Sequence, residues 1–372
     1  MKTVYFTHSL DSCWNHGNAH FLRGVMSELT ARGHLAEAWE PRDAWSRANL
    51  VADHGEAGLE PYKRAYPELQ SHRFDPPLDL DRALEGADLV IVHEWNDPAL
   101  VAAIGRRRAT GRFTLLFHDT HHRAVSEPEA MKAFDLSRYD GVLAFGETLA
   151  EVYRQWGWGD RVFVWHEAAD TRLFRPPTVE QDREGLVWVG NWGDGERTAE
   201  LERYLFAPTA ATGLGLDLYG VRYPEAAKRM LSRYGVRYHG WLANAAAPQV
   251  FARHLATVHV PRRFYVEQLP GIPTIRVFES LACGLPLVSA PWSDSEGLFD
   301  VGRDFLMVRS SSEMAEALRA LKSDPGLRAE LAAHGLAAIR ARHTCAHRVD
   351  ELMAVLERLG AVAPSPQMEI AE

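Results

Sequence analysis

A loop rich in proline and glycine leads into an expected helix over residues 274–283, which carries a threonine, an arginine and a glutamate. The first turn, at Thr274 after Pro273, suits an anion such as a diphosphate, because the N-terminus of a helix is positive. Glu279 lies one turn further along and could bind the two hydroxyls of a ribose. The alternatives are a plain helix cap at Thr274 and a structural ion pair between Arg276 and Glu279.

A glycine-rich turn at residues 190–197 follows an expected strand and precedes another expected helix. Its glycines, beginning with Gly190 before Asn191, let the backbone approach a ligand closely. Arg197 could donate a forked pair of hydrogen bonds to a diphosphate. The alternative is an ordinary turn that ends in a surface arginine, and the position of the turn favours phosphate binding.

The first strand-to-helix turn of the chain contains Gly17 and Asn18 directly before an amphipathic segment. A small residue here would let a ligand reach the amides at the helix N-terminus. The turn lacks the G-x-G-x-x-G pattern, so a turn glycine with an asparagine cap is an equal interpretation.

Two further polar clusters follow expected strands of the first half. One contains His118 and Asp119 within the run 118–122, and it could orient a hydroxyl-bearing substrate or hydrogen-bond to a developing charge. Adjacent histidines on a loop lack the i,i+4 geometry of a helical zinc motif, so we predict no metal site, and a solvated loop is the remaining alternative. In the other cluster, Glu94 could meet sugar hydroxyls and Trp95 could stack on a sugar, or these residues could simply end a strand before a capped helix.

The elements that must position these residues alternate between short apolar runs and longer amphipathic runs, which is typical of βα units with parallel strands. The sequence therefore predicts an α/β fold built from two doubly wound domains in tandem. In the first half we expect strands at residues 4–6, 89–93, 113–117, 142–145 and 162–165, and helices at 19–32, 98–108 and 147–156. In the second half we expect strands at 186–189, 216–219, 257–260, 287–289 and 305–308, and helices at 196–206, 225–234, 274–283, 312–322, 327–342 and 345–359.

The composition and the net charge argue against several classes of protein. The 372 residues carry a formal net charge of −9, which argues against a nucleic-acid partner. The three cysteines lie far apart, so neither a disulfide framework nor a cysteine metal site is expected. The chain shows no signal-like start and no stretch of transmembrane length, so we expect a cytoplasmic protein without integral membrane association.

The segment around Glu279 resembles the donor-site signature of the retaining family-4 glycosyltransferases, and most closely that of the CgeB-like, spore-maturation branch. The resemblance rests on the run 276–284 and on a later run at 343–348 before the final helix. It implies a GT-B fold: a Rossmann-like acceptor domain over residues 1–172, a Rossmann-like donor domain over 173–342, a helix over 343–360 that packs back on the first domain, and a flexible tail over 361–372.

By this resemblance, Glu279 binds the donor ribose and the Thr274 region contacts the diphosphate, with Gly190 and Arg197 on the other side of the phosphates. His118 matches a histidine that family members place near the reacting centre. Arg276 is a further candidate for stabilising the leaving diphosphate.

The chain departs from the family at one carboxylate. The family carries two glutamates separated by seven residues, and the position eight before Glu279 is Gly271. The Arg/Lys pair usual in the glycine-rich segment is also incomplete.

We therefore expect a hexosyltransferase that uses a UDP- or GDP-type sugar as donor, needs neither metal nor cofactor, retains configuration, and acts on a sugar, lipid-linked or small-molecule acceptor. The alternatives are a non-catalytic sugar-nucleotide or glycan-binding protein of a surface-assembly system, and a GT-B nucleotide-sugar epimerase.

Overall fold

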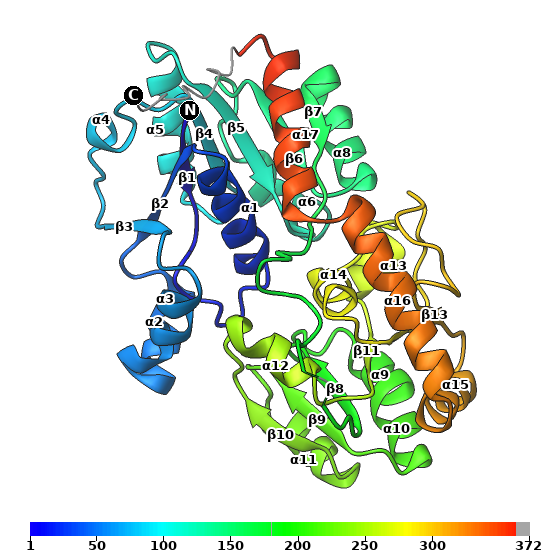
Figure 1. The fold of residues 1–372 in the computed structure, drawn as a ribbon. Helices are drawn as coiled ribbons and strands as arrows, with labels where there is room; N and C mark the ends of the chain where they lie inside the picture. Colours follow the sequence, from blue (N-terminus) through cyan, green and yellow to red (C-terminus); the bar gives the residue numbers. More distant parts are fainter. Residues whose placement is uncertain (180, 362–372) are drawn as a thin grey trace, which may run out of the picture.

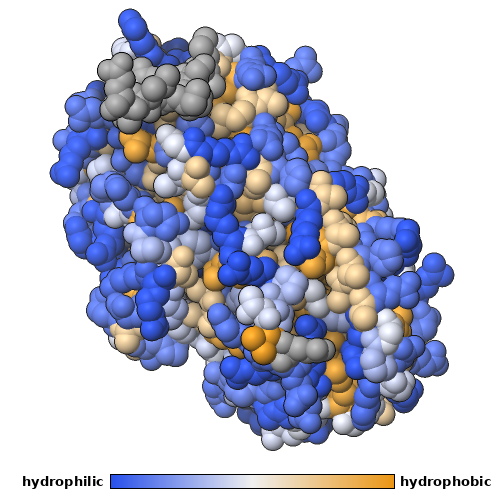
Figure 2. Space-filling model, in the orientation of Figure 1, coloured by the Kyte–Doolittle hydropathy of each residue, from blue (hydrophilic) through white to orange (hydrophobic). Residues whose placement is uncertain are grey.

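The structure is a computed structural model that describes residues 1–179 and 181–361. It consists of two lobes, each built around a parallel β-sheet with helices on its faces (Figure 1). The predicted α/β class with two Rossmann-like domains is confirmed. The face seen in Figure 2 is largely hydrophilic, with apolar residues interspersed. None of the helices among the described residues combines the length and the hydropathy needed to cross a membrane.

The first lobe contains a seven-stranded sheet in the order β3-β2-β1-β4-β5-β6-β7. Its strands are β1 (Lys2–Phe6), β2 (Leu35–Pro41), β3 (Gln70–Phe74), β4 (Leu89–His93), β5 (Thr114–Asp119), β6 (Gly141–Ala144) and β7 (Val162–Val164). The five strands expected in this half are present. β2 and β3 were not predicted, because both are only partly buried, β2 carries two glutamates and a proline, and the sequence of β3 is mostly polar.

The helices of the first lobe are α1 (Ala19–Ala31), α2 (Trp45–His54), α3 (Glu60–Ala65), α4 (Leu80–Ala83), α5 (Pro98–Arg108), α6 (Arg123–Ser126), α7 (Pro128–Lys132) and α8 (Glu147–Tyr153). The expected cap before Pro98 forms, since the side chain of Asp97 accepts a hydrogen bond from the amide of Ala99 and Pro98 occupies the first helical turn. A π-helical segment (Arg154–Trp158) extends α8, which accounts for the longer helix expected there.

The second lobe contains a six-stranded sheet in the order β10-β9-β8-β11-β12-β13. Its strands are β8 (Leu186–Val189), β9 (Leu216–Tyr219), β10 (Arg237–Gly240), β11 (Ala256–His259), β12 (Leu287–Ser289) and β13 (Leu306–Met307). β10 is an exposed edge strand of polar residues and was not predicted. The helices are α9 (Thr198–Leu201), α10 (Ala207–Thr212), α11 (Glu225–Arg233), α12 (Ala247–Phe251), α13 (Arg263–Glu267), α14 (Ile275–Ala282), α15 (Ser311–Ser323) and α16 (Pro325–Arg342).

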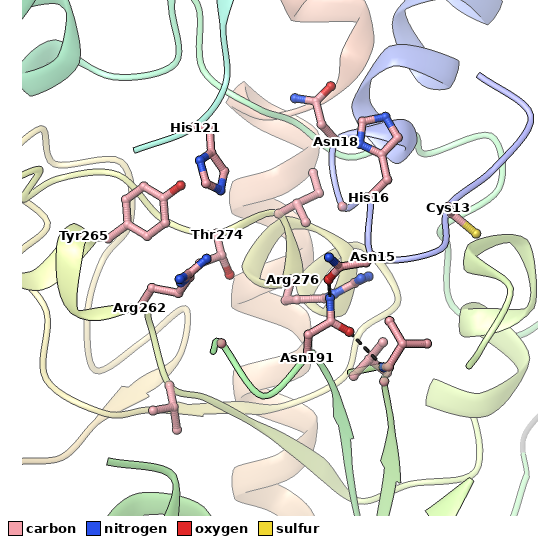
Figure 3. Close-up of a pocket in the computed structure, with 18 of the residues that line it drawn as sticks. Cys13, Asn15, His16, Asn18, His121, Asn191, Arg262, Tyr265, Thr274 and Arg276 are labelled. Atoms are coloured by element: carbon pink, nitrogen blue, oxygen red, sulfur yellow. Dashed lines mark hydrogen bonds between the residues drawn. The ribbon is translucent and has the colours of Figure 1, made fainter. Parts of the chain in front are cut away.

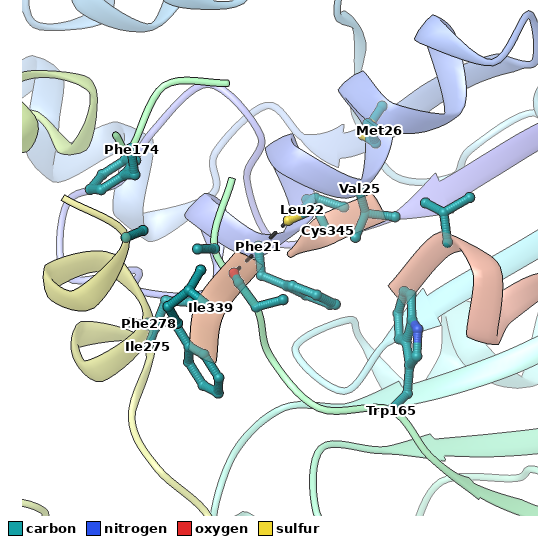
Figure 4. Packing of buried hydrophobic residues seen from close by; sticks show 14 of the residues in the cluster. Phe21, Leu22, Val25, Met26, Trp165, Phe174, Ile275, Phe278, Ile339 and Cys345 are labelled. Carbon is teal, nitrogen blue, oxygen red and sulfur yellow. Dashed lines mark hydrogen bonds between the residues drawn. The ribbon is translucent and has the colours of Figure 1, made fainter. Parts of the chain in front are cut away.

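The final helix, α17 (Cys345–Arg358), leaves the second lobe after α16 and packs against α1 of the first lobe (Figure 1). The indole Nε1 of Trp165 donates a hydrogen bond of 2.7 Å to the carbonyl of Arg348 on this helix. Phe21 on α1, Phe278 on α14 and Cys345 on α17 belong to one apolar cluster (Figure 4). The expected return of the last helix to the first lobe is thus confirmed, and a shared core joins the lobes.

The expected boundary between residues 172 and 173 falls in the segment that connects β7 to β8. The expected tail at 361–372 lies, apart from Ala361, outside the described residues.

Candidate functional site

A cleft of about 780 Å³ lies between the two lobes, and its lining comes from the loops that follow the parallel strands of both sheets (Figure 3). Of the residues predicted from sequence, those that line it are Gly17, Asn18, Trp95, Gly190, Asn191, Arg197, Thr274 and Arg276. Loops at the carboxyl ends of parallel strands form the usual ligand crevice of open α/β sheets. The turns that the sequence predicts to bind the ligand therefore line one common cleft.

Arg197 provides a buried positive charge in the wall of this cleft. Its guanidinium donates hydrogen bonds of 2.7 Å each to the carbonyls of Val260 and Asn191, and it lies over the ring of Trp188. Within the described part of the chain it forms no ion pair, and its Nε has no hydrogen-bond partner. Burial lowers the pKa of Arg197 to about 10, so the side chain is still cationic at neutral pH. A buried cation without a direct ion-pair partner among the described residues suits an anionic ligand.

The glycine-rich turn at residues 193–195 positions the side chain of Arg197. Gly193 and Gly195 have positive φ angles of 82° and 86°, and Asp194 between them has φ 56°. A Cβ at position 193 would lie 2.9 Å from Nε of Arg197, so the turn can fold over the guanidinium only because this residue is glycine.

The N-terminus of α14 faces the same cleft. Thr274 is its N-cap residue, has extended backbone angles, and makes no capping hydrogen bond with its side chain. The hydroxyl and the first amides are therefore available to a ligand, as the sequence predicts. Pro273 is buried and leads the chain into this turn.

Arg276 and Glu279 form an ion pair on α14, which is the structural alternative considered from the sequence. The carboxylate also accepts a hydrogen bond of 2.6 Å from Nδ2 of Asn244, and Nδ1 of His20 lies 3.3 Å away. Glu279 is fully buried, and of this pair only Arg276 lines the cleft. The carboxylate expected to bind a ribose thus holds a cleft-lining cation instead.

The loop before α1 closes the first-lobe side. A Cβ at Gly17 would lie 3.5 Å from Ile275, so this loop packs directly on the start of α14. Oδ1 of Asn15 accepts a hydrogen bond from Nδ2 of Asn191 across the cleft. Nδ2 of Asn18 lies 3.4 Å from Oε1 of Glu167.

His118 does not line the cleft, whereas the sequence leads us to expect it near the reacting centre. It pairs with His93 across β4 and β5, and its Nδ1 lies 3.2 Å from Nε2 of His93. The ring packs against Phe21 and Trp165 in the interior of the lobe. Side chains along a strand point alternately to the two faces of the sheet, and His118 lies on the face that α1 covers.

Glu94 and Asp119 are also buried away from the lining, whereas Trp95 lines the cleft. Oε1 of Glu94 accepts a hydrogen bond of 2.9 Å from Thr120, and Oδ2 of Asp119 accepts one of 2.8 Å from the hydroxyl of Tyr153. Burial, and the charge of Asp119, raise the pKa of Glu94 to about 8, and burial raises that of Asp119 to about 6. These two carboxyls support the wall behind the cleft.

Several lining residues were not predicted from the sequence, and they include His16, His121, Glu167, His259 and Arg262. His121 lies in the predicted polar run, three residues beyond His118 and past the end of β5, and Figure 3 shows it facing the cleft near Tyr265. Burial lowers the pKa of His121 well below its ordinary value and that of His259 to about 3, so both rings are neutral at physiological pH. Glu167 follows β7, and strand-end position would have been the signal for it.

The described residues contain no group of three or more histidine, cysteine, aspartate or glutamate side chains arranged to hold a metal ion.

Two facing Rossmann-like lobes, a cleft between them and a final helix that returns to the first lobe define the GT-B fold of glycosyltransferases. A family model described as "Glycosyl transferase-like" matches residues 197–354. A comparison with curated proteins finds no match to the sequence.

Solved structures share this fold over almost the whole chain. HepE from Anabaena, in complex with UDP-glucose, superposes with a TM-score of 0.69 at 15% identity and covers 97% of this chain and 100% of its own. Sucrose-phosphate synthase from Thermosynechococcus elongatus has a TM-score of 0.67 at 15% identity and covers 98% of this chain and 100% of its own. An alpha-glucosyltransferase in complex with UDP-glucose and DNA has a TM-score of 0.70 at 11% identity and covers 95% of this chain and 98% of its own.

Proposed function

We propose that this protein is a glycosyltransferase that moves a hexosyl unit from a UDP-sugar to an acceptor hydroxyl. The observation that carries the proposal is the buried guanidinium of Arg197, which forms no ion pair among the described residues and faces the interlobe cleft of a GT-B fold. A diphosphate would supply the counter-charge that Arg197 lacks. UDP is favoured over the GDP-type donor because structures with this fold were solved in complex with UDP-glucose.

The reaction develops negative charge on the leaving diphosphate. Arg197, the first amides of α14 at Thr274, and Arg276 lie around the cleft where that charge would form. Fixed donors in a site with little water stabilise such charge without having to reorganise during the reaction. We therefore propose that transfer requires neither a metal ion nor a cofactor.

The acceptor binds against the first-lobe wall in this proposal. Trp95 offers an apolar face, and the neutral imidazole of His121, whose Nδ1 has no partner, offers a hydrogen bond. His121 takes the place that the sequence assigned to His118. For a retaining reaction, attack occurs on the face that the diphosphate leaves, and the leaving phosphate accepts the acceptor proton.

Gly271 favours one competing function, that of a non-catalytic sugar-nucleotide-binding protein. This residue has φ 95°, and a Cβ here would lie 2.4 Å from Oγ of Ser295. A glutamate at this position would therefore meet a left-handed backbone and a close contact with the Ser295 hydroxyl. Donor binding and catalytic turnover thus need separate tests.

Calorimetric titration with UDP and with GDP tests donor binding. We expect UDP to bind and Arg197→Gln to weaken it at least about tenfold, since a charge-assisted pair is lost. Arg203→Gln, which removes an equal charge from an exposed position outside the cleft, should leave UDP affinity unchanged. Equal affinity of wild type and Arg197→Gln for UDP would refute the site.

Product analysis then separates transferase from binder and epimerase. UDP-glucose is incubated with a panel of sugar, lipid-linked and small-molecule acceptors, and the mixture is assayed for free UDP and for a glycosylated product. Acceptor-dependent release of UDP supports transfer, and the anomeric configuration of the product, determined by NMR, decides retention. Conversion of the UDP-sugar without UDP release would identify an epimerase, and binding without any conversion would identify a binder.

A further inference from the structure

Glu167 is an unpaired carboxyl group inside the donor cleft. It lies in the loop after β7, lines the cleft, and is 7% exposed. The hydrogen bond to its side chain comes from the amide of Asn18, over 3.4 Å. Among the residues that the structure describes, no arginine, lysine or histidine forms an ion pair with it.

The ionisable groups around Glu167 lie on four helices, α14, α13, α17 and α1. α14 contributes the Arg276–Glu279 pair, in which Arg276 is already bound to the other carboxylate. α13 contributes the phenol of Tyr265, which is uncharged because burial raises its pKa. Arg348 on α17 donates to the backbone carbonyl of Glu167, over 3.5 Å, and its side chain pairs with Glu351.

His20 on α1 faces the same group of carboxyls. Burial lowers the pKa of His20 below its ordinary value, so this ring adds no cation at neutral pH. Glu167 and Glu279 therefore lie near each other, and both neighbouring cations, Arg276 and Arg348, are already paired with other carboxylates.

A buried carboxylate without a cation is costly, and protonation removes the cost. In agreement with this geometry, burial, followed by the negative charge of Glu279, raises the pKa of Glu167 to about 8. At pH 7 the side chain therefore holds a proton that an ordinary glutamate would have lost.

We infer that Glu167 acts in the cleft as a neutral carboxylic acid that donates its O–H to a diphosphate oxygen of the bound nucleotide sugar. The inference rests on the proposed function, because the acceptor of this hydrogen bond is the donor substrate. Loss of the proton replaces a hydrogen bond by repulsion between two anions, so alkaline pH releases the donor. Glu167 is a donor-binding residue in this account, and it does not remove the proton of the acceptor hydroxyl.

The protonation state can be tested without any ligand. Infrared difference spectra of wild type minus Glu167→Gln should show a carboxylic-acid C=O band at pH 7. The band should disappear as the pH rises through about 8. Glu151→Gln, a change at an exposed glutamate on α8, should give no such band at pH 7. Absence of the band at pH 7 in the Glu167→Gln difference would overturn the inference.

Donor binding is the second measurement, made by calorimetry with UDP at pH 7 and at about pH 9.5. Wild type should lose at least about tenfold in affinity between these values, because the ionised carboxylate repels the diphosphate. Glu167→Gln, which keeps a neutral N–H donor, should bind UDP with nearly unchanged affinity at both values, and Glu167→Ala should bind weakly at both.

The two measurements separate the failure of this inference from the failure of the proposed function. If wild type fails to bind UDP at pH 7, both fall, whatever the infrared band shows. If wild type binds UDP and its pH dependence equals that of Glu167→Gln, the proposed function stands and this inference falls.

Discussion

Arg276 and Glu279 form an ion pair across one turn of α14 in which the two partners have different access to water. The carboxylate of Glu279 is completely buried, whereas the side chain of Arg276 is 32% exposed at the cleft. The pair therefore places a cation at the surface of the donor cleft and anchors it to the protein interior. The spacing of these residues on one helix is readable from the sequence, but which of them faces the ligand is decided by packing.

This asymmetry predicts unequal costs for breaking the pair. Arg276→Gln leaves a buried carboxylate without its cation and should destabilise the fold by about 3 kcal/mol or more, whereas Glu279→Gln leaves an arginine that water can reach and should cost about 1–2 kcal/mol. Glutamine at 279 can still accept the hydrogen bond from Asn244. Chemical denaturation of both variants and of the double variant gives the comparison, and equal losses would contradict the assignment of Glu279 as the buried partner.

The central strands of both sheets could be predicted because buried parallel strands are continuous apolar runs, as in Val90, Ile91 and Val92 of β4. β3 and β10 lie at sheet edges, where the apolar pattern fades into polar residues and leaves little signal. Edge strands take their conformation from the neighbouring strand rather than from their own composition.

The candidate site was predictable at the level of loops but not at the level of side-chain direction. Strand β5, which ends just after His118, and helix α14, which carries Glu279, both reach the cleft, yet these two side chains are buried in the interior. His121, three residues beyond His118, lies past the strand end and faces the ligand space. Glu167 belongs to no recognised spacing, and its lack of a cation is a property of the three-dimensional surroundings alone.

The buried carboxyl of Glu167 predicts a pH-dependent stability. Its pKa is raised to about 8 in the folded state, so the folded chain binds one more proton than the unfolded chain between about pH 4.3 and 8. The free energy of unfolding therefore falls as the pH rises across this window, by on the order of 5 kcal/mol from this group. Glu167→Gln removes the dependence, so its stability relative to wild type should increase from acidic to neutral and alkaline pH.

Thermal unfolding of wild type and Glu167→Gln at about pH 5 and 8 measures this difference. Glu94, whose pKa is also raised to about 8, is present in both proteins and cancels in the comparison. A constant difference in melting temperature across the pH range would show that Glu167 is ionised in the folded protein.

The contact between α1 and α17 predicts that a single methyl group at Gly24 is harmful. A Cβ at this position would lie 2.5 Å from Sγ of Cys345 and 2.8 Å from Cβ of Asp170. Gly24→Ala should therefore destabilise the protein by about 1–3 kcal/mol, although alanine is the better helix former.

Cys345→Ser keeps the clash and should not rescue the variant, whereas Cys345→Gly should recover part of the loss. Denaturant unfolding measures each step, and a Gly24→Ala protein as stable as wild type would mean that α17 packs less closely on α1.

Gly271→Glu, which introduces the glutamate that the family-4 resemblance would place here, is predicted to destabilise the protein without raising its activity. The residue has φ 95°, and Oγ of Ser295 lies only 2.4 Å from the position that a Cβ would occupy. The left-handed backbone costs about 1–2 kcal/mol for a residue with a side chain, and the clash adds to it. The matched control is Gly33→Glu, because Gly33 has φ 80° and open space around its Cβ position, so it carries the backbone cost alone.

Gly271→Glu should be clearly less stable than Gly33→Glu in thermal unfolding and should show no gain in UDP release from UDP-glucose. A stable Gly271→Glu protein with increased turnover would show that the loop around Ser295 can move aside for the carboxylate, and that the wild-type chain lacks a group that its cleft could accommodate.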